Sequence, residues 1–265
     1  MDALRKHVPF KGFLKRLARR IRMRWLAGDA VQCPICGWQG ARFMDGSWHE
    51  RAICPQCEGD IRHRLVMASF RYLNAYRSET FLAGKKILHF APEPGIAQYL
   101  RQLTKYYVTA DLHQQGVDLK IDISNMPEIP DGSYDVVIAA DILEHVTSYH
   151  QALREVHRIL QPGGSAVITV PQKDNLEVTY EDPAITDPQE RTRAFGEPTH
   201  LRIFGADFPA KLASAGFRIS VVDAGSFDER TVFRHVLKPP VLSKHPLATN
   251  HRRIFFCFKK PGEGG

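Results

Sequence analysis

The sequence predicts an α/β protein whose largely parallel sheet follows a basic helix and a small cysteine-rich module. Three observations support this fold class. Strand and helix patterns alternate from Gly84 onward, which is typical of a parallel sheet covered by helices on both faces. Four cysteines form two closely spaced pairs ahead of that region, and the first residues mix cationic and apolar side chains at helical spacing. A chain of 265 residues can hold a full core and a smaller module.

Residues 1–28 are expected to form a basic amphipathic helix. They contain nine of the 36 Lys and Arg residues and one acid, Asp2, which leaves 27 basic and 28 acidic residues in the nearly neutral remainder of a chain with net charge +7. Apolar residues recur at gaps of three and four along one face. Such a helix suits an anionic membrane surface. Packing on the protein's own body and binding to RNA backbone are the alternatives that the sequence leaves open.

The rest of the composition bears on localisation. No apolar run reaches the roughly 18 residues of a membrane span, and arginine and lysine interrupt the N-terminal apolar residues, unlike in a secretory signal. We therefore expect a cytoplasmic protein, with the N-terminal helix as a means of peripheral attachment at the inner face of the membrane.

Residues 29–60 have the cysteine spacing of a zinc ribbon. Cys33 and Cys36 form one C-x₂-C pair, Cys54 and Cys57 form the other, and seventeen residues separate the pairs. This spacing predicts a tetrahedral four-thiolate zinc site. With no open ligand position the site is expected to be structural, although recognition of a substrate or partner is the alternative. Cys257, alone in RRIFFCF, is expected in a buried strand.

A connecting helix is expected over residues 61–83. Its first turn carries Arg62, His63 and Arg64 directly after the second cysteine pair. These cations either contact an anionic group of a substrate or form a solvated face, and the sequence leaves both open.

The α/β body is expected over residues 84–265. Its predicted strands are 85–90, 106–111, 117–122, 134–141, 165–170, 218–224 and 252–258, and its predicted helices are 95–103, 148–160 and 207–217. Three strands end in an aspartate: Asp111, Asp122 and Asp141. Open α/β sheets bind ligands at this carboxyl edge, although aspartate is also a common cap or turn residue.

YDVVIAADILEHV, followed by ALREVHRILQPGGSAVITVP, resembles the class I S-adenosylmethionine-dependent methyltransferases, over roughly residues 84–260. The resemblance implies a Rossmann-like seven-stranded sheet with its last strand antiparallel, and S-adenosyl-L-methionine as cofactor. It also implies Asp111 on the ribose, Asp122 with Ile123 at the adenine, and Asp141 near the methionine end, with Leu112 as a further cofactor contact. CPQC, RHRL, LHFAPE and TYEDPAITDPQERTRAFGEPTHLRIFG are similar to an uncharacterised bacterial group of methyltransferases with an N-terminal zinc ribbon.

The first loop departs from the family's usual acid followed by Gly-x-Gly-x-Gly. His89 replaces the acid, Ala91 the first glycine and Glu93 the second, whereas Gly95 matches the third. We expect Glu93 to bind the cofactor's ammonium group in place of the usual contacts. The alternative is a degenerate site that kept the fold and lost the cofactor.

Methyl transfer requires alignment of the acceptor and, for an oxygen or nitrogen acceptor, a base. His145 and His200 are the candidate bases. The insertion 171–205 is expected to form the acceptor pocket, with Tyr180 and Arg202 as substrate contacts. The near-neutral body favours transfer to oxygen of a small-molecule or glycan-type acceptor, including a lipid-linked one. RNA methylation through the zinc ribbon and basic helix, and a non-catalytic module that senses the cofactor, are the alternatives. The sequence does not give the oligomeric state.

Overall fold

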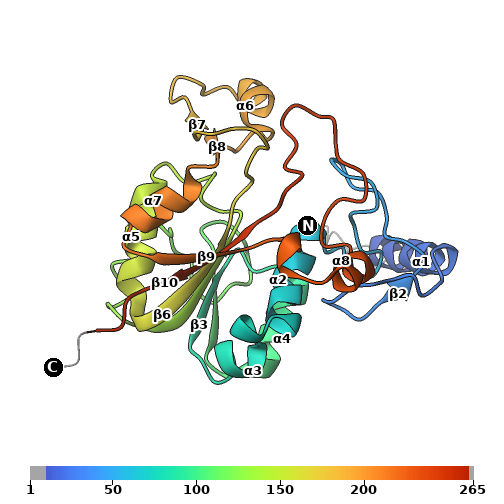
Figure 1. Ribbon diagram of the computed structural model, residues 1–265, viewed down its shortest axis with the longest axis horizontal. Helices are drawn as coiled ribbons and strands as arrows, with labels where there is room; N and C mark the ends of the chain where they lie inside the picture. The colour runs from blue at the N-terminus through green and yellow to red at the C-terminus, as the bar shows by residue number, and fades with distance from the viewer. Residues whose placement is uncertain (1–9, 263–265) are drawn as a thin grey trace, which may run out of the picture.

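The computed structural model describes residues 10–262 and has one mixed six-stranded sheet at its centre (Figure 1). The strands run in the order β4-β3-β5-β6-β10-β9. Their bounds are β3 Ile87–Phe90, β4 Tyr107–Ala110, β5 Tyr134–Ala140, β6 Leu160–Thr169, β9 Arg218–Val222 and β10 Ile254–Phe258. Neighbours among β4, β3, β5 and β6 pair parallel, whereas β10 pairs antiparallel with both β6 and β9. The Rossmann-like class and the antiparallel last strand are confirmed.

The expected strand at 117–122 is absent from this sheet, which therefore has six described strands rather than seven. This segment forms only an isolated parallel bridge between Ala110 and Leu119. The carboxylate of Asp118 accepts hydrogen bonds from the backbone N–H and the hydroxyl of Thr109, at 2.8 and 2.7 Å. The N–H of Thr109, which would pair with a seventh strand, is thus bonded to a side chain. Regular pairing of this segment with β4 therefore does not extend.

Helices cover both faces of the sheet. Side chains alternate along each strand, so Leu88 packs into one apolar core with α5 (Tyr149–Ile159) and α7 (Phe208–Ser214), whereas Ile87 packs into another with α2 (Ile61–Tyr72) and α4 (Pro94–Leu103). Cys257 in β10 is fully buried, as expected.

The segment expected as one connecting helix, 61–83, is broken. α2 ends at Tyr72, and η1 (Asn74–Tyr76) and α3 (Ser78–Phe81) follow. Asp60 begins α2 with a capping box, because its side chain accepts from the amide of His63 and the His63 ring accepts from the amide of Asp60. The helix start lies directly after the second cysteine pair, which ties the small module to the sheet domain.

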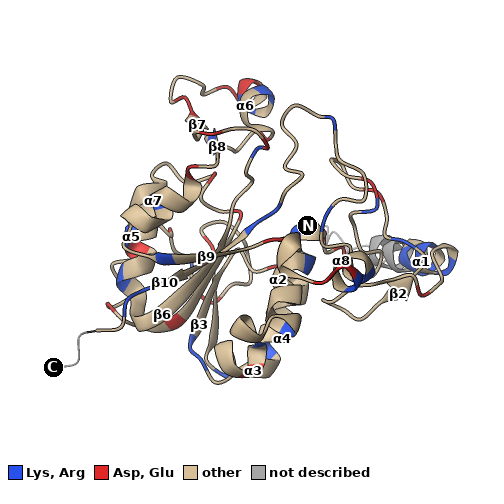
Figure 2. Cartoon of the chain, viewed as in Figure 1, with Lys and Arg blue, Asp and Glu red and all other residues tan. Residues whose placement is uncertain are grey.

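The N-terminal part consists of α1 (Phe10–Trp25) and a hairpin of β1 (Val31–Gln32) and β2 (Gln39–Gly40). Residues 1–9 of the expected basic helix lie outside the described part of the chain. At the end of α1, Met23 and Leu26 pack on the cysteine module, whereas Ile21 and Trp25 are exposed. Basic residues lie along the described part of this helix (Figure 2). Within residues 10–262, no helix has the length and hydropathy required to cross a membrane.

The insertion 171–205 forms a cap beyond the sheet edge, at the top of Figure 1. It contains β7 (Tyr180–Glu181), α6 (Pro188–Phe195) and β8 (Arg202–Ile203), with β7 and β8 paired antiparallel. α8 (Glu229–His235) lies beside the cysteine module, since the His235 ring contacts the carbonyl of Gln32 at 2.8 Å.

Candidate functional site

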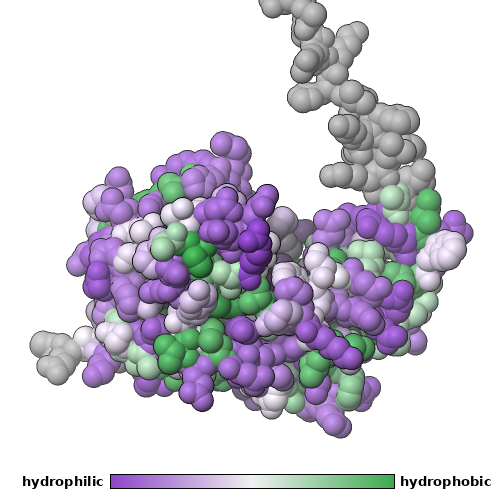
Figure 3. Space-filling model, turned by 90° about the horizontal axis from the view of Figure 1, so that it is seen from above, coloured by the Kyte–Doolittle hydropathy of each residue, from purple (hydrophilic) through white to green (hydrophobic). Residues whose placement is uncertain are grey.

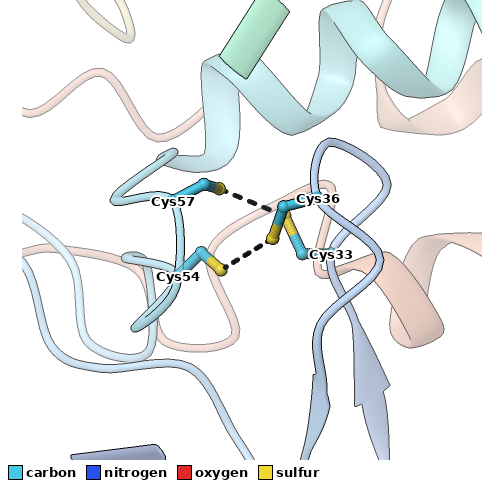
Figure 4. Close-up of side chains that lie close together, drawn as sticks. All are labelled: Cys33, Cys36, Cys54 and Cys57. Carbon is cyan, nitrogen blue, oxygen red and sulfur yellow. Dashed lines mark hydrogen bonds between the residues drawn. The ribbon is translucent and has the colours of Figure 1, made fainter. Parts of the chain in front are cut away.

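The four cysteines converge from two loops that face one another (Figure 4). The sulfurs of Cys33 and Cys57 are 3.6 Å apart and those of Cys36 and Cys54 are 3.7 Å apart, and all four lie within 4.8 Å of one another. Zinc–sulfur bonds of about 2.3 Å place tetrahedral sulfurs about 3.8 Å apart. The cluster therefore fits the predicted four-thiolate site, and its sulfurs are too far apart for disulfides.

The buried Arg64 fixes this module to the sheet domain. It is fully inaccessible, and its guanidinium donates to the carbonyls of Ala52, Gly59, His235 and Val236. Arg64 therefore has a structural role. It does not have either expected role, contact with an anionic group of a substrate or a place on a solvated face.

Ile35, in the first cysteine loop, makes a second connection. A Cβ atom at Gly59 would lie 2.5 Å from Ile35 Cδ1, and one at Gly95 would lie 2.5 Å from Ile35 Cγ2. Gly95 thus lets the first cysteine loop approach the start of α4. This is a packing reason for the residue, separate from the expected approach to a cofactor.

A cavity of about 520 Å³ lies at the carboxyl ends of β3 and β5, the edge where open α/β sheets bind ligands. Five parts of the chain line it: the cysteine module through Trp48 and His49, the start of α2, the strand-end turns, the cap, and a loop near the C-terminus that adds Arg252. Seen from above, the molecule is mainly hydrophilic, with apolar patches near the middle of the face (Figure 3).

The turn after β3 keeps a left-handed backbone although glycine is missing. Ala91 has φ +44°, a conformation that costs an alanine roughly 1–2 kcal/mol. Asp141, in the turn after β5, has φ +51°. Both residues line the cavity. Strain of this kind often accompanies a functional constraint.

Glu93 reaches the cavity from the same turn and is held by three cationic or imidazole groups. Its Oε2 lies 3.0 Å from Nε2 of the fully buried His89, and its Oε1 lies 3.5 Å from His63 Nε2 and 3.7 Å from Arg62 Nη2. Burial alone would raise the pKa of Glu93, but hydrogen bonds with His63 and His89 lower it well below its usual range. Glu93 is therefore a carboxylate at neutral pH, and the buried ring of His89 contacts it.

Arg62 lies between the carboxylates of Glu93 and Asp141, which follow β3 and β5. Its Nη1 lies 3.2 Å from Asp141 Oδ2, and Arg252 Nη1 contacts the same oxygen at 3.2 Å. Asp141 Oδ1 accepts from the Thr169 hydroxyl. Burial would raise the pKa of Asp141, but the two arginines outweigh it and lower the pKa. The Nε of Arg62 is buried without a hydrogen-bond partner.

The other two strand-end aspartates lie outside this cavity and organise turns. Asp111 Oδ1 accepts from the amides of His113 and Gln114, and Asp122 Oδ1 accepts from the amide and hydroxyl of Ser124. Each therefore has the turn-forming role that was the alternative, which is compatible with further contacts from its second oxygen. Leu112 is exposed, whereas Ile123 is buried next to Asp122. The expected ribose and adenine contacts of these four residues stay predictions.

His145 and His200, the two candidate bases, lie next to one another. Their ring centroids are 4.7 Å apart, and both line the cavity. The amide of Leu201 donates to the carbonyl of Glu144, which brings the cap loop onto the loop after β5. Burial, and then the charge of His200, lower the pKa of His145.

Glu144 belongs to the same cluster, and the sequence analysis did not single it out. Its side chain is 1% exposed, and its Oε2 has no hydrogen-bond partner. Burial and the neighbouring charge of Asp141 raise its pKa well above the usual range. DILEHV contains this residue beside His145, so the motif held a signal, whereas Arg252 and Trp48 reach the cavity through tertiary structure alone.

The structure gives Arg202 a different role from the expected substrate contact. It is 3% exposed, and it donates to the carbonyls of Leu143, Val146 and Thr147 and to Glu181. These bonds hold the loop after β5 against the cap. Tyr180 is partly exposed and lies against Phe195 at 5.5 Å between ring centroids. Among the described residues, neither Tyr180 nor Arg202 lines the cavity.

Comparison with known proteins bears on the sheet domain. Residues 91–168 match the family model Methyltransf_11, described as a methyltransferase domain. The matched residues run from the turn after β3 into β6, so this part of the sheet domain is similar to a methyltransferase domain.

Two curated relatives match this domain in part. An uncharacterised 37.1 kDa protein of transposon TN4556 from Streptomyces fradiae is 31% identical over 101 residues, which cover 38% of this chain and 29% of that protein. An S-adenosyl-L-methionine-dependent Diels-Alderase of Talaromyces variabilis is 30% identical over 100 residues, 37% of this chain and 34% of that protein. The matches thus span about a third of these relatives' length.

A solved S-adenosylmethionine-dependent methyltransferase from Mesorhizobium loti is similar to this chain with a TM-score of 0.48 and 17% identity. The likeness covers 72% of this chain and 98% of that one.

Proposed function

We propose that this protein transfers a methyl group from S-adenosyl-L-methionine to a hydroxyl oxygen of a small-molecule or glycan-type acceptor. The observation that carries the proposal is the cavity at the carboxyl ends of β3 and β5, whose lining combines charged groups with the His145–His200 pair. Its volume of about 520 Å³ is within the usual range for small-molecule sites.

The charged side of the cavity fits the zwitterionic end of the cofactor. Arg62 has a buried Nε without a partner, which suits a carboxylate, and Glu93 is a buried carboxylate that suits an ammonium group. Binding then exchanges the Arg62–Glu93 ion pair for two ion pairs with the ligand, so that no charge is left unpaired. Asp141 keeps Arg62 in place. The ribose would lie toward Asp111 and Leu112, and the adenine toward Asp122 and Ile123.

The bound cofactor supplies a methyl group on a sulfonium, which is electrophilic at carbon. The protein's own task is to hold the acceptor oxygen in line with the carbon–sulfur bond and exclude water. A lone pair of the oxygen forms the new bond to carbon, the carbon–sulfur electron pair goes to sulfur, and the hydroxyl proton leaves. An imidazole of His145 or His200 is close enough to the cavity to receive that proton.

Labelled turnover tests this function and identifies the acceptor class. The full chain is incubated with methyl-tritiated S-adenosylmethionine and cell extract, and the label is measured in small-molecule, glycolipid and RNA fractions. We expect label in a small-molecule or glycolipid fraction with formation of S-adenosylhomocysteine. Label confined to RNA would establish the RNA alternative. Cofactor binding without transfer to any fraction would overturn methyl transfer. This outcome matters because one relative that is named as dependent on S-adenosyl-L-methionine is a Diels-Alderase.

A lipid-linked acceptor would also give the N-terminal helix a use. Trp25 is 86% exposed and Ile21 is 49% exposed on α1, next to Arg20, Arg22 and Arg24. Exposed aromatic and cationic residues on one helix favour the interface of an anionic bilayer.

Vesicle co-sedimentation tests the membrane contact. We expect Trp25→Ala to weaken binding to phosphatidylglycerol vesicles, whereas Phe233→Ala, which removes an aromatic ring on α8 that is 65% exposed, should leave it unchanged. Equal loss in both variants, or no binding by the wild type, would contradict attachment through α1.

A further inference from the structure

The residue types of the cluster Glu144, His145 and His200 suit metal binding as well as proton transfer. One oxygen of the carboxylate and one nitrogen of each imidazole lie within 4.8 Å of one another. Metal–ligand bonds of about 2.1 Å bring ligand atoms about 3–4 Å apart. Small side-chain rotations would therefore close these three donors around one ion.

Glu144 provides an independent sign of a missing positive partner. Its side chain is almost completely buried, and its Oε2 has neither a hydrogen-bond donor nor a close cation. The nearby Arg62 and Arg252 both pair with Asp141 instead. An acid oxygen buried without a hydrogen-bond partner is costly, and a divalent cation that displaces the proton of Glu144 to solvent would satisfy it.

The hydrogen bonds of His200 prepare it to act as a ligand. Its Nδ1 lies 3.1 Å from the carbonyl of Phe195, and because a carbonyl only accepts, Nδ1 carries the hydrogen. In the neutral ring Nε2 then presents a lone pair. Ligating histidines commonly donate their other nitrogen to a carbonyl in this way. Glu197 lies 3.6 Å from the same Nε2, and its side chain is 56% exposed, so it can turn away or complete the coordination.

We propose that Glu144, His145 and His200 bind a divalent transition-metal ion in the wall of the cavity, separate from the four-cysteine site. Two imidazoles and one carboxylate suit Zn²⁺, Fe²⁺, Mn²⁺ or Co²⁺ and leave coordination positions open. The open positions face the cavity, where an acceptor hydroxyl would bind, and a bound cation makes such a hydroxyl more acidic. This second role rests on the proposed function, whereas the binding of the ion does not.

Manganese is the sharpest probe, because it prefers oxygen and nitrogen ligands and leaves the thiolate site to zinc. The full chain, loaded with zinc and freed of loosely bound metal, is titrated with Mn²⁺ and followed by calorimetry and by the electron paramagnetic resonance signal of free Mn²⁺. We expect one Mn²⁺ per chain beyond the zinc. Glu144→Gln and His145→Ala should each weaken its binding more than ~10-fold, whereas His251→Ala, which changes an exposed histidine, should not.

The outcomes separate the two proposals. Because the titration needs neither cofactor nor acceptor, failure of methyl transfer leaves its result unaffected. If Glu144→Gln does not fold, His145→Ala decides, since that side chain is partly exposed at 37%. Absence of binding by Mn²⁺ and Co²⁺, or the same affinity in wild type and His145→Ala, would overturn the metal site and leave the imidazoles as free bases.

Discussion

Replacing Glu93 with glutamine tests the arrangement on which cofactor binding depends. The substitution keeps the shape of the side chain and removes its charge. In the structure this carboxylate lies 3.0 Å from His89, 3.5 Å from His63 and 3.7 Å from Arg62, at the wall of the cavity. If it accepts the ammonium group of the cofactor, one charge-assisted hydrogen bond is lost.

A hydrogen bond to a charged group contributes about 1.5–3 kcal/mol, and about 1.4 kcal/mol corresponds to a tenfold change in affinity. We therefore expect Glu93→Gln to weaken S-adenosylhomocysteine binding between about tenfold and a hundredfold, measured by titration calorimetry. The matched control is Glu79→Gln, at an exposed glutamate on α3, which should leave affinity unchanged. Equal affinities of wild type and Glu93→Gln would exclude Glu93 from the site. No heat with either protein would support the degenerate site.

The same variant has a pH signature in stability. Because hydrogen bonds with His63 and His89 outweigh burial, the pKa of Glu93 is lower in the folded protein than in the unfolded chain. Its charge thus contributes stability above the unfolded pKa of about 4.3, and this is lost as pH falls through the folded pKa. The difference in unfolding free energy between wild type and Glu93→Gln should shrink as the pH falls below about 4. A difference that grows on acidification below that pH would refute this sign.

Three further outcomes concern the framework of the site. Arg64→Met should destabilise the protein by more than ~4 kcal/mol in urea unfolding, because buried carbonyls lose a charged donor, whereas the exposed Arg77→Met should change it by less than ~0.5 kcal/mol. Ala91→Gly should raise stability by up to about 1 kcal/mol, since relief of the positive φ exceeds the entropy cost of glycine; a loss would show that Ala91 is unstrained. Chelation of metal from the cysteine site should expose the buried Trp38 and shift its fluorescence, and an unchanged spectrum would argue against a structural metal.

Local patterns were sufficient to predict much of the fold. The strands at β3, β4, β5, β6, β9 and β10 follow from short apolar runs bounded by turn residues, and their alternation with helices implied a parallel sheet. The expected seventh strand does not form, because the Asp118 carboxylate accepts a hydrogen bond from the backbone N–H of Thr109 in the edge strand β4. Pairing partners of an edge strand depend on such contacts, which periodicity does not record.

The candidate site likewise has features that the sequence predicts and features that it does not. Cysteine spacing, the strand-end Asp141 and the two histidines could be predicted from the sequence, because metal geometry and strand ends restrict which residues lie near one another. Whether a particular cation lies on a protein surface or in its interior could not. Arg62, His63 and Arg64 are adjacent in one helical turn, yet Arg62 faces the cavity and Arg64 faces the cysteine module.

The sequence by itself determined the class of fold, the four-cysteine module and two histidines that line the cavity. Only the tertiary structure decided that the cysteine module, the cap and a loop near the C-terminus close over one edge of the sheet, and that Glu144 lies unpaired beside two imidazoles. The physical reason is that local spacing governs turns and metal loops, whereas the pairing of buried charges depends on segments far apart in the chain.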